Sequence, residues 1–229
     1  MKTLALLLAL SLCLLSHPTS AKPKPIRLLS HPTSAKLKPI RLGTDVPIAS
    51  TGAPVVDADG DALQPGGAYN ITSITWGAGA GEVKLEWRDS NTKCPSDVVS
   101  WLYADPVVFT PADPKATAVL ESSFLSFKFN VVTNFLCSGN LYWGVQHDAV
   151  SGMDFVRSDE FVVNQSDRFK IERVESIMPI YIITYCPSGT DKCYYVGREF
   201  DESIKSTRLA ISDFPFMVLF KKTSLASAK

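Results

Sequence analysis

The residues best suited to recognise a partner lie between Cys94 and Cys137. The stretch from Phe109 to Ala118 is polar and braced by two prolines, and Lys115 is its only basic residue. If the two cysteines are bonded, this stretch becomes part of a closed loop fastened to a rigid body. Such a loop presents one cationic side chain in a fixed position.

Two other segments have the composition of catalytic or nucleotide-binding motifs. His147 and Asp148 supply two members of a Ser-His-Asp triad, but that chemistry needs nucleophile, base and orienting acid in register. The sequence has no G-x-S-x-G motif to supply the nucleophile. The run from Gly77 to Gly81 has the glycines of a phosphate-binding loop, but neither GK[ST] nor a helical pattern follows it. We therefore expect a Gly-rich hairpin there, and no enzymatic activity.

Cysteine use indicates an oxidising compartment. One of the five cysteines lies in the leader, and the remaining four, Cys94, Cys137, Cys186 and Cys193, allow three connectivities that the sequence alone does not resolve. Residues 186–193 have the turn chemistry of a hairpin closed at its base, which leaves Cys94 and Cys137 for a second bond. There is no CxxC pair, and His147 is the only histidine after residue 42, so we expect no metal site and no cofactor.

The first 42 residues differ from the rest. Lys2, the apolar run from Leu4 to Leu15 and the small residues before Ala21 predict a secretory signal peptide over residues 1–21. The run is too short to span a bilayer, so we expect no membrane association after signal removal. Residues 14–28 recur at 28–42 with a single change, a tandem too short to bury a core. We predict a propeptide over 22–44 and a folded domain over 45–229.

Charge is divided unevenly between leader and body. Residues 1–42 contain seven of the 23 basic residues and none of the 23 acidic ones, so residues 43–229 carry a net charge of −7. An acidic body is poorly suited to bind nucleic acid or an anionic membrane, and we expect neither partner.

From Asp45 onward, short strand-like runs recur between clusters of Gly, Pro, Asn and Asp. Several alternate with a period of two, and no stretch shows a sustained apolar stripe with helical spacing. The pattern predicts one all-β barrel or sandwich. The clearest predicted strands cover residues 83–87, 126–130, 169–174, 181–185 and 216–220.

Five segments match, in order, the landmarks of a known family: 54–69, 94–99, 169–172, 185–187 and 208–212. Over residues 46–222 the chain resembles the plant Kunitz-type (soybean trypsin inhibitor-like) protease inhibitors. Three further segments, 76–79, 143–148 and 191–198, resemble its tuberous-root storage members. The resemblance implies a β-trefoil of twelve strands in three pseudo-repeats. It also implies the disulfides Cys94–Cys137 and Cys186–Cys193.

The resemblance further implies inhibition of trypsin-like serine proteases through a loop that the protease binds like substrate. A loop already fixed in its bound shape avoids the ordering cost that a flexible peptide incurs. Counting back without gaps from residues 127–130 places the reactive bond at Lys115–Ala116. Pro114 stiffens the backbone before it, and the Lys115 cation would meet the carboxylate at the floor of the protease pocket. Lys192, in the smaller ring, is a second candidate contact.

One residue departs from the family pattern. Pro65 stands where the family has an Asn that supports the loop, and proline has no amide to hold the loop's carbonyl groups. This departure favours an alternative function, a reserve storage protein with vestigial or weak inhibitory activity. A carbohydrate-binding trefoil is disfavoured, because the four tryptophans show no three-fold period.

Each copy of the leader repeat ends in Lys-Pro-Ile-Arg-Leu. This resembles the Asn-Pro-Ile-Arg-Leu vacuolar sorting determinant of plant storage-protein propeptides, with Lys in place of Asn. We expect a vacuolar sorting receptor to bind the propeptide and deliver the protein to the vacuole through the secretory pathway; the alternative is an extracellular protein. The predicted signal residues are Pro25, Ile26, Arg27, Leu28, Pro39, Ile40, Arg41 and Leu42.

Two sequons are candidates for N-glycosylation, Asn70-Ile-Thr and Asn164-Gln-Ser. Asn164 is the better acceptor because it sits in a polar loop. Asn70 follows Tyr69 inside a predicted strand.

Overall fold

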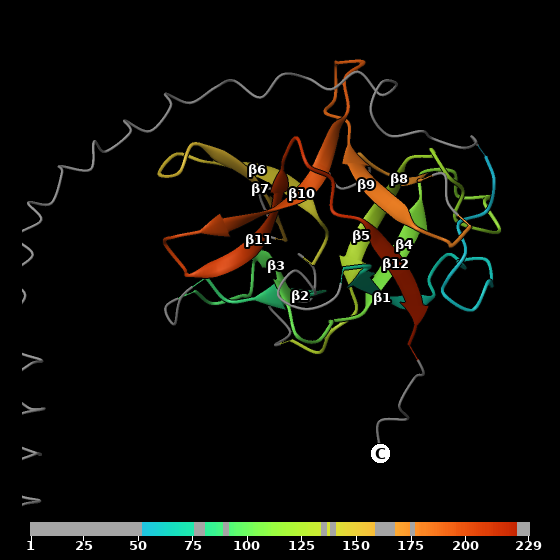
Figure 1. Ribbon diagram of the computed structural model, residues 1–229, viewed down its shortest axis with the longest axis horizontal. Helices are drawn as coiled ribbons and strands as arrows, with labels where there is room; N and C mark the ends of the chain where they lie inside the picture. The colour runs from blue at the N-terminus through green and yellow to red at the C-terminus, as the bar shows by residue number, and fades with distance from the viewer. Residues whose placement is uncertain are drawn as a thin grey trace, which may run out of the picture. The chain divides into compact units, whose positions relative to one another are not determined.

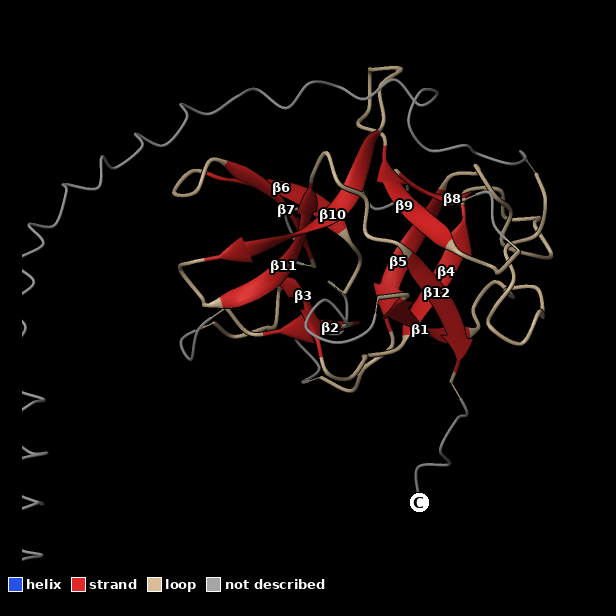
Figure 2. Ribbon diagram, in the orientation of Figure 1, coloured by secondary structure: helices blue, strands red, loops and turns tan. Residues whose placement is uncertain are grey.

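The computed structural model describes residues 52–75, 81–88, 92–133, 137, 141–158, 168–174 and 177–223. These residues form twelve β-strands and no helix (Figure 2), so none of them forms a helix that could cross a membrane. The strands are β1 (Ala68–Ser73), β2 (Glu82–Glu86), β3 (Asp97–Trp101), β4 (Val107–Pro111), β5 (Leu125–Phe129), β6 (Gly144–Asp148), β7 (Met153–Arg157), β8 (Phe169–Arg173), β9 (Tyr181–Tyr185), β10 (Tyr194–Asp201), β11 (Ser206–Ile211) and β12 (Val218–Lys222). The predicted signal peptide, propeptide and sorting residues, and Asn164, lie outside the described residues.

The all-β prediction is confirmed, and the predicted strands are present. β2, β5, β8 and β9 begin and end within one residue of the expected limits. β12 begins two residues later than expected, because the Phe216 amide donates to the Val196 carbonyl, 2.9 Å away in β10, rather than joining the β12 ladder. In β1 and β2 buried side chains alternate with half-buried ones, as strands with one covered face require.

Six of the strands close into a ring of antiparallel pairs. β1 pairs with β12, β12 with β9, β9 with β8, β8 with β5, β5 with β4, and β4 with β1. Closure leaves these strands without a free edge along which another chain could pair. Figure 1 shows the ring strands on the right of the view.

The other six strands form three hairpins, β2–β3, β6–β7 and β10–β11. The three hairpins are joined to one another through one strand each. A single bridge links each pair among β3, β7 and β11. The hairpins gather on the left of the view in Figure 1. Each group of four consecutive strands therefore contributes two ring strands and one hairpin.

Aromatic side chains fill the core. Phe127 stacks on Trp143 with ring centroids 4.7 Å apart and meets Phe109 edge-on at 5.1 Å. Phe109 also meets Phe220 edge-on at 5.4 Å, and all four side chains are buried. These geometries are the ones that aromatic quadrupoles favour. Phe109 of β4 and Phe127 of β5 are paired across these two strands. The core therefore anchors the two strands that flank the connection between β4 and β5.

A buried ionic cluster joins the three hairpins. Arg208 of β11 is fully buried, and its guanidinium donates to Asp97 of β3 at 2.7 Å and to Asp201 of β10 at 2.8 Å. It also lies 3.8 Å from the ring centroid of Phe155 in β7. Arg157 of β7 approaches Asp97 at 3.7 Å. Charges placed this deeply persist only when paired, so the cluster ties the positions of the hairpins to one another.

Both predicted disulfides are present. Cys94, just before β3, is bonded to Cys137, and their Cα atoms are 5.5 Å apart. Cys186 is bonded to Cys193 across the β9–β10 connection, where Tyr185 pairs with Tyr194. Loop-closure entropy gives about 4 kcal/mol of stabilisation for the long ring and about 2–3 kcal/mol for the short one.

Candidate functional site

The connection between β4 and β5 carries the predicted reactive residues. Pro114 and Lys115 are exposed and Ala116 is half-buried. The two strands pair as far as Pro111 and Leu125, and the Ala112 amide then donates to the Phe124 carbonyl at 2.9 Å. Residues 112–124 therefore form a loop whose ends are held together at the ring; we call it the β4–β5 loop.

Lys115 lies within a hydrogen-bonded turn near the tip of this loop. The Ala116 amide donates to the Asp113 carbonyl at 3.1 Å, and the Lys115 amide donates to the Asp113 carboxylate at 2.9 Å. Aspartate is favoured at the start of such a turn because its side chain accepts from the backbone two residues on. The side chain of Lys115 thus faces solvent, while its backbone amide is engaged within the loop.

The base of the loop is bonded to the N-terminal segment, residues 52–67. The Val119 amide donates to the Leu63 carbonyl at 2.9 Å, and the Val55 amide donates to the Val119 carbonyl at the same distance. The Glu121 amide donates to Ala53 at 2.8 Å. Figure 1 shows this segment, in cyan, beside the green β4–β5 loop. The tip of the loop therefore projects from a base fixed by backbone hydrogen bonds.

The far end of the loop is tied to β8. Ser122 has a φ of 59°, in the left-handed region, and its amide donates to the Ile171 carbonyl at 2.9 Å. Its hydroxyl donates to Glu172, which is buried. Burial raises the pKa of Glu172, although the hydrogen bond from Ser122 acts in the opposite direction. A strained backbone position held by two partners indicates a tightly specified loop end.

Pro65 lies in a tight turn of the N-terminal segment. The Gly67 amide donates to the Gln64 carbonyl at 3.0 Å, and Gly66 has a φ of 77°, which suits glycine. The Gly66 amide also donates to Phe109 of β4 at 3.1 Å. The segment therefore supports the β4–β5 loop through its backbone, at the place where the family resemblance implies a side-chain amide.

The remaining sequence candidates lie elsewhere. Lys192 is exposed in the ring closed by Cys186 and Cys193, and its amide donates to the Thr190 hydroxyl at 2.9 Å. Asn70 is half-buried in β1, opposite Lys221 of β12, and its side-chain oxygen is buried. No strand pairing joins Lys192 or Asn70 to the β4–β5 loop.

The side chains of His147 and Asp148 have different partners. The His147 ring nitrogen Nδ1 lies 2.9 Å from Asp154, across the β6–β7 hairpin. Asp148 accepts from Arg88 at 2.7 Å and from the amides of Val150 and Ser151. Burial alone would raise the pKa of Asp148, but these bonds lower it to about 2. Among the described residues, no group of three or more His, Cys, Asp or Glu side chains is suited to a metal ion.

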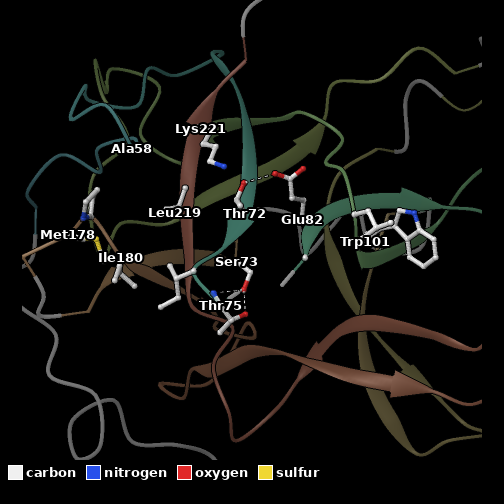
Figure 3. Close-up of a pocket in the computed structure, with 14 residues that line it drawn as sticks. Ala58, Thr72, Ser73, Thr75, Glu82, Trp101, Met178, Ile180, Leu219 and Lys221 are labelled. Carbon is white, nitrogen blue, oxygen red and sulfur yellow. Dashed lines mark hydrogen bonds between the residues drawn. The ribbon is translucent and has the colours of Figure 1, made fainter. Parts of the chain in front are cut away.

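A pocket of about 650 Å³ lies between the ring and the first hairpin, and the sequence did not predict it (Figure 3). Thr72 of β1 and Leu219 of β12 line one side, and Trp101 of β3 lines another. These residues are far apart in the sequence and carry no shared motif, so only the paired strands reveal that they meet.

Comparison with known proteins agrees with this architecture. The family described as trypsin and protease inhibitor, of the Kunitz legume type, matches residues 55–222. Sporamin B of Ipomoea batatas is 43% identical over 98% of this chain and 100% of its own length. A solved Kunitz-type cysteine protease inhibitor from potato has 29% identity and a TM-score of 0.62, covering 76% of this chain and 98% of its own.

The solved complex of porcine pancreatic trypsin with soybean trypsin inhibitor also matches. It has 28% identity and a TM-score of 0.62, and the match covers 75% of this chain and 99% of the matched chain. The described residues thus share both sequence and fold with these inhibitors. The chain therefore belongs to the Kunitz-type trypsin and protease inhibitor family.

Proposed function

We propose that the protein is not an enzyme and that it inhibits a trypsin-like serine protease through the β4–β5 loop. Lys115 supplies the cation for the primary specificity pocket, and Lys115–Ala116 is the reactive bond. The observation that carries this proposal is an exposed lysine in a loop whose base is fixed by backbone hydrogen bonds, from the Val119 amide to the Leu63 carbonyl and from the Glu121 amide to the Ala53 carbonyl. Inhibitors of proteases change little in backbone shape on binding, so a base of this kind lowers the ordering cost.

We propose that the twelve strands form a β-trefoil with three pseudo-repeats. Each repeat would comprise four consecutive strands, β1–β4, β5–β8 and β9–β12. In each repeat the first and fourth strands pair in the ring, and the second and third form a hairpin. The three bridges among β3, β7 and β11 relate the hairpins in the same way.

We also propose that the protein is delivered to the vacuole through the propeptide of residues 22–44 and serves there as an amino-acid reserve. The two Pro-Ile-Arg-Leu segments and the signal-peptide pattern support this proposal. A sorting receptor is the expected partner.

A reserve protein with weak inhibition is the second candidate function. Two observations favour it: Pro65 cannot offer a side-chain amide to the loop, and the Lys115 amide is engaged by Asp113. A peptide bound in extended form is recognised through its main-chain hydrogen bonds, so a protease would have to open the 113–116 turn. Family membership does not decide the target, because one similar structure is named as a cysteine protease inhibitor.

Titration of the purified protein against trypsin, with papain in a parallel series, tests the proposal. We expect saturable inhibition of trypsin that Lys115→Ala weakens about 30-fold or more, because a desolvated charge pair is lost. Lys192→Ala, at an exposed lysine in another loop, should leave inhibition unchanged. If Lys115→Ala inhibits trypsin as well as Lys192→Ala does, Lys115 is not the primary specificity residue. Inhibition of neither trypsin nor papain would favour the reserve function.

A further inference from the structure

The pocket beside the first hairpin has the dimensions of a small-molecule site. Its volume of about 650 Å³ lies within the range of about 300–1,000 Å³ that is usual for such sites. Its floor is the outer face of the β1–β12 ladder, where Thr72 pairs with Leu219. The start of β2 and the end of β3 form one wall, and residues 178–180 form the opposite wall (Figure 3). The pocket shares no residue with the β4–β5 loop.

Large apolar side chains are exposed on both walls. Trp101 is 45% exposed and Leu102 84% exposed on one wall, and Met178 is 61% exposed on the other. Isolated exposed apolar residues are ordinary on a protein surface, but apolar residues gathered around a concavity mark a binding groove. Ile180 and Leu219 continue the apolar surface between the walls.

Polar side chains also line this largely apolar pocket. The Thr72 hydroxyl donates to one oxygen of Glu82 at 3.1 Å, and Figure 3 shows Lys221 approaching Thr72 from the other side. Among the described residues Lys221 makes no ion pair, so its ammonium group keeps donors to offer. At the end of the pocket the hydroxyls of Ser73 and Thr75 lie 2.6 Å apart.

This combination specifies the chemistry of a ligand. The Lys221 ammonium group and the Glu82 carboxylate, on the two sides of Thr72, offer a donor and an acceptor without net charge. A hydroxyl group satisfies both, since it donates and accepts. The exposed indole of Trp101, which lies at the edge of the pocket in Figure 3, suits a flat ring system. We propose that the pocket binds a small, neutral, hydroxylated aromatic molecule of the phenolic class, with its rings between Trp101 and Met178 and its hydroxyls toward Glu82 and Lys221.

Isothermal titration of the whole protein with the flavanone naringenin tests this proposal. A ligand of this size in a partly open site should bind with a Kd on the order of 10–100 µM. Unsubstituted flavone has a similar ring system without hydroxyls, and we expect it to bind about tenfold more weakly. Lys115→Ala, in the β4–β5 loop, should bind naringenin like the wild type.

Two tryptophans of the first hairpin provide a matched comparison. Trp101 lines the pocket, whereas Trp87 is 50% exposed just beyond β2 and does not. We expect Trp101→Ala to weaken naringenin binding at least about tenfold, and Trp87→Ala to have no effect. Leu102→Ser is a second pocket variant at a side chain so exposed that folding should be unaffected. Thermal unfolding confirms that each variant is folded.

Three results would overturn the proposal. The first is no binding up to the solubility limit of naringenin. The second is equal loss of binding in Trp101→Ala and Trp87→Ala, which would indicate nonspecific adsorption to exposed indoles. The third is flavone bound as tightly as naringenin, which would show that Glu82 and Lys221 play no part and that the groove suits an apolar segment of another protein.

Discussion

At the scale of single residues, the charge of Lys115 and its backbone have different roles. The ammonium group is exposed and ready for a partner. The amide is held by Asp113, in a turn that differs from the extended form in which a protease binds a peptide. The proposed inhibition therefore depends on how easily the turn of residues 113–116 opens.

Replacing Asp113 tests that dependence. Asp113→Ala removes the bond to the Lys115 amide, which is worth about 1 kcal/mol, and should tighten inhibition of trypsin about fivefold. Asp113→Asn keeps an acceptor oxygen at the same place and should behave like the wild type. Inhibition constants of the three proteins are the measurement. A weaker Asp113→Ala inhibitor would show that the turn is the bound form.

Asp148 gives a second prediction, on pH. Its pKa is lowered in the folded protein to about 2, so its contribution to stability is present above about pH 4 and is lost as the pH falls toward 2. We expect Asp148→Asn to lower the free energy of unfolding by about 1–2 kcal/mol at pH 7, and by almost nothing at pH 2. Denaturant titrations at both pH values measure this.

Asp154→Asn is the control for Asp148. Asp154 is in an exposed pair with His147 on the same hairpin, and exposed pairs contribute little. A loss of stability in Asp148→Asn that is the same at both pH values would contradict the assigned role of its charge.

At the scale of elements, the hairpins are joined by charge as well as by strand pairing. Removing the Arg208 guanidinium leaves Asp97 and Asp201 buried without the cation that they share. We expect Arg208→Met to destabilise the protein by about 3–5 kcal/mol. Lys205→Met, at an exposed ion pair in the β10–β11 turn, should change stability little.

Chemical denaturation of both variants distinguishes the roles. An Arg208→Met protein as stable as the wild type would show that packing against Phe155 and the strand ladders suffices without the buried charges. The Lys205 variant controls for the removal of a positive charge as such.

The sequence predicts the strands well because their signal is local. Alternation in β2 and the turn chemistry between Cys186 and Cys193 act over a few residues. The ionic cluster has no such signal, since Asp97 and Arg208 lie 111 positions apart and meet only when β3 and β11 pair. The pocket is hidden for the same reason. The turn at Asp113 depends on neighbouring residues only. The same residues can also adopt an extended backbone, and composition alone does not decide between the two conformations.

At the scale of the whole molecule, we propose separate tasks for the leader and the folded body. The leader, which the resemblance connects with sorting, carries a net positive charge, and the body carries a net negative charge. Residues 1–44 fused to a fluorescent reporter should reach the vacuole. Changing Ile26 and Ile40 together to Gly should divert the reporter outside the cell, because both copies of the motif lose their central apolar residue.

Microscopy and assay of the medium provide the readout for the reporter. Changing Ile26 alone is the control, since the second copy remains. Vacuolar delivery of the double variant would contradict the sorting role of the two segments.

The reactive bond itself tests the central claim most directly. The protein is incubated with a catalytic amount of trypsin at mildly acidic pH, and the new amino terminus is identified by mass spectrometry before and after reduction. We predict a single cleavage, at Lys115–Ala116. Because that bond lies inside the Cys94–Cys137 ring, the two parts should stay joined until the disulfide is reduced. Cleavage at Lys192–Cys193 instead, or at many sites at once, would contradict inhibition through Lys115.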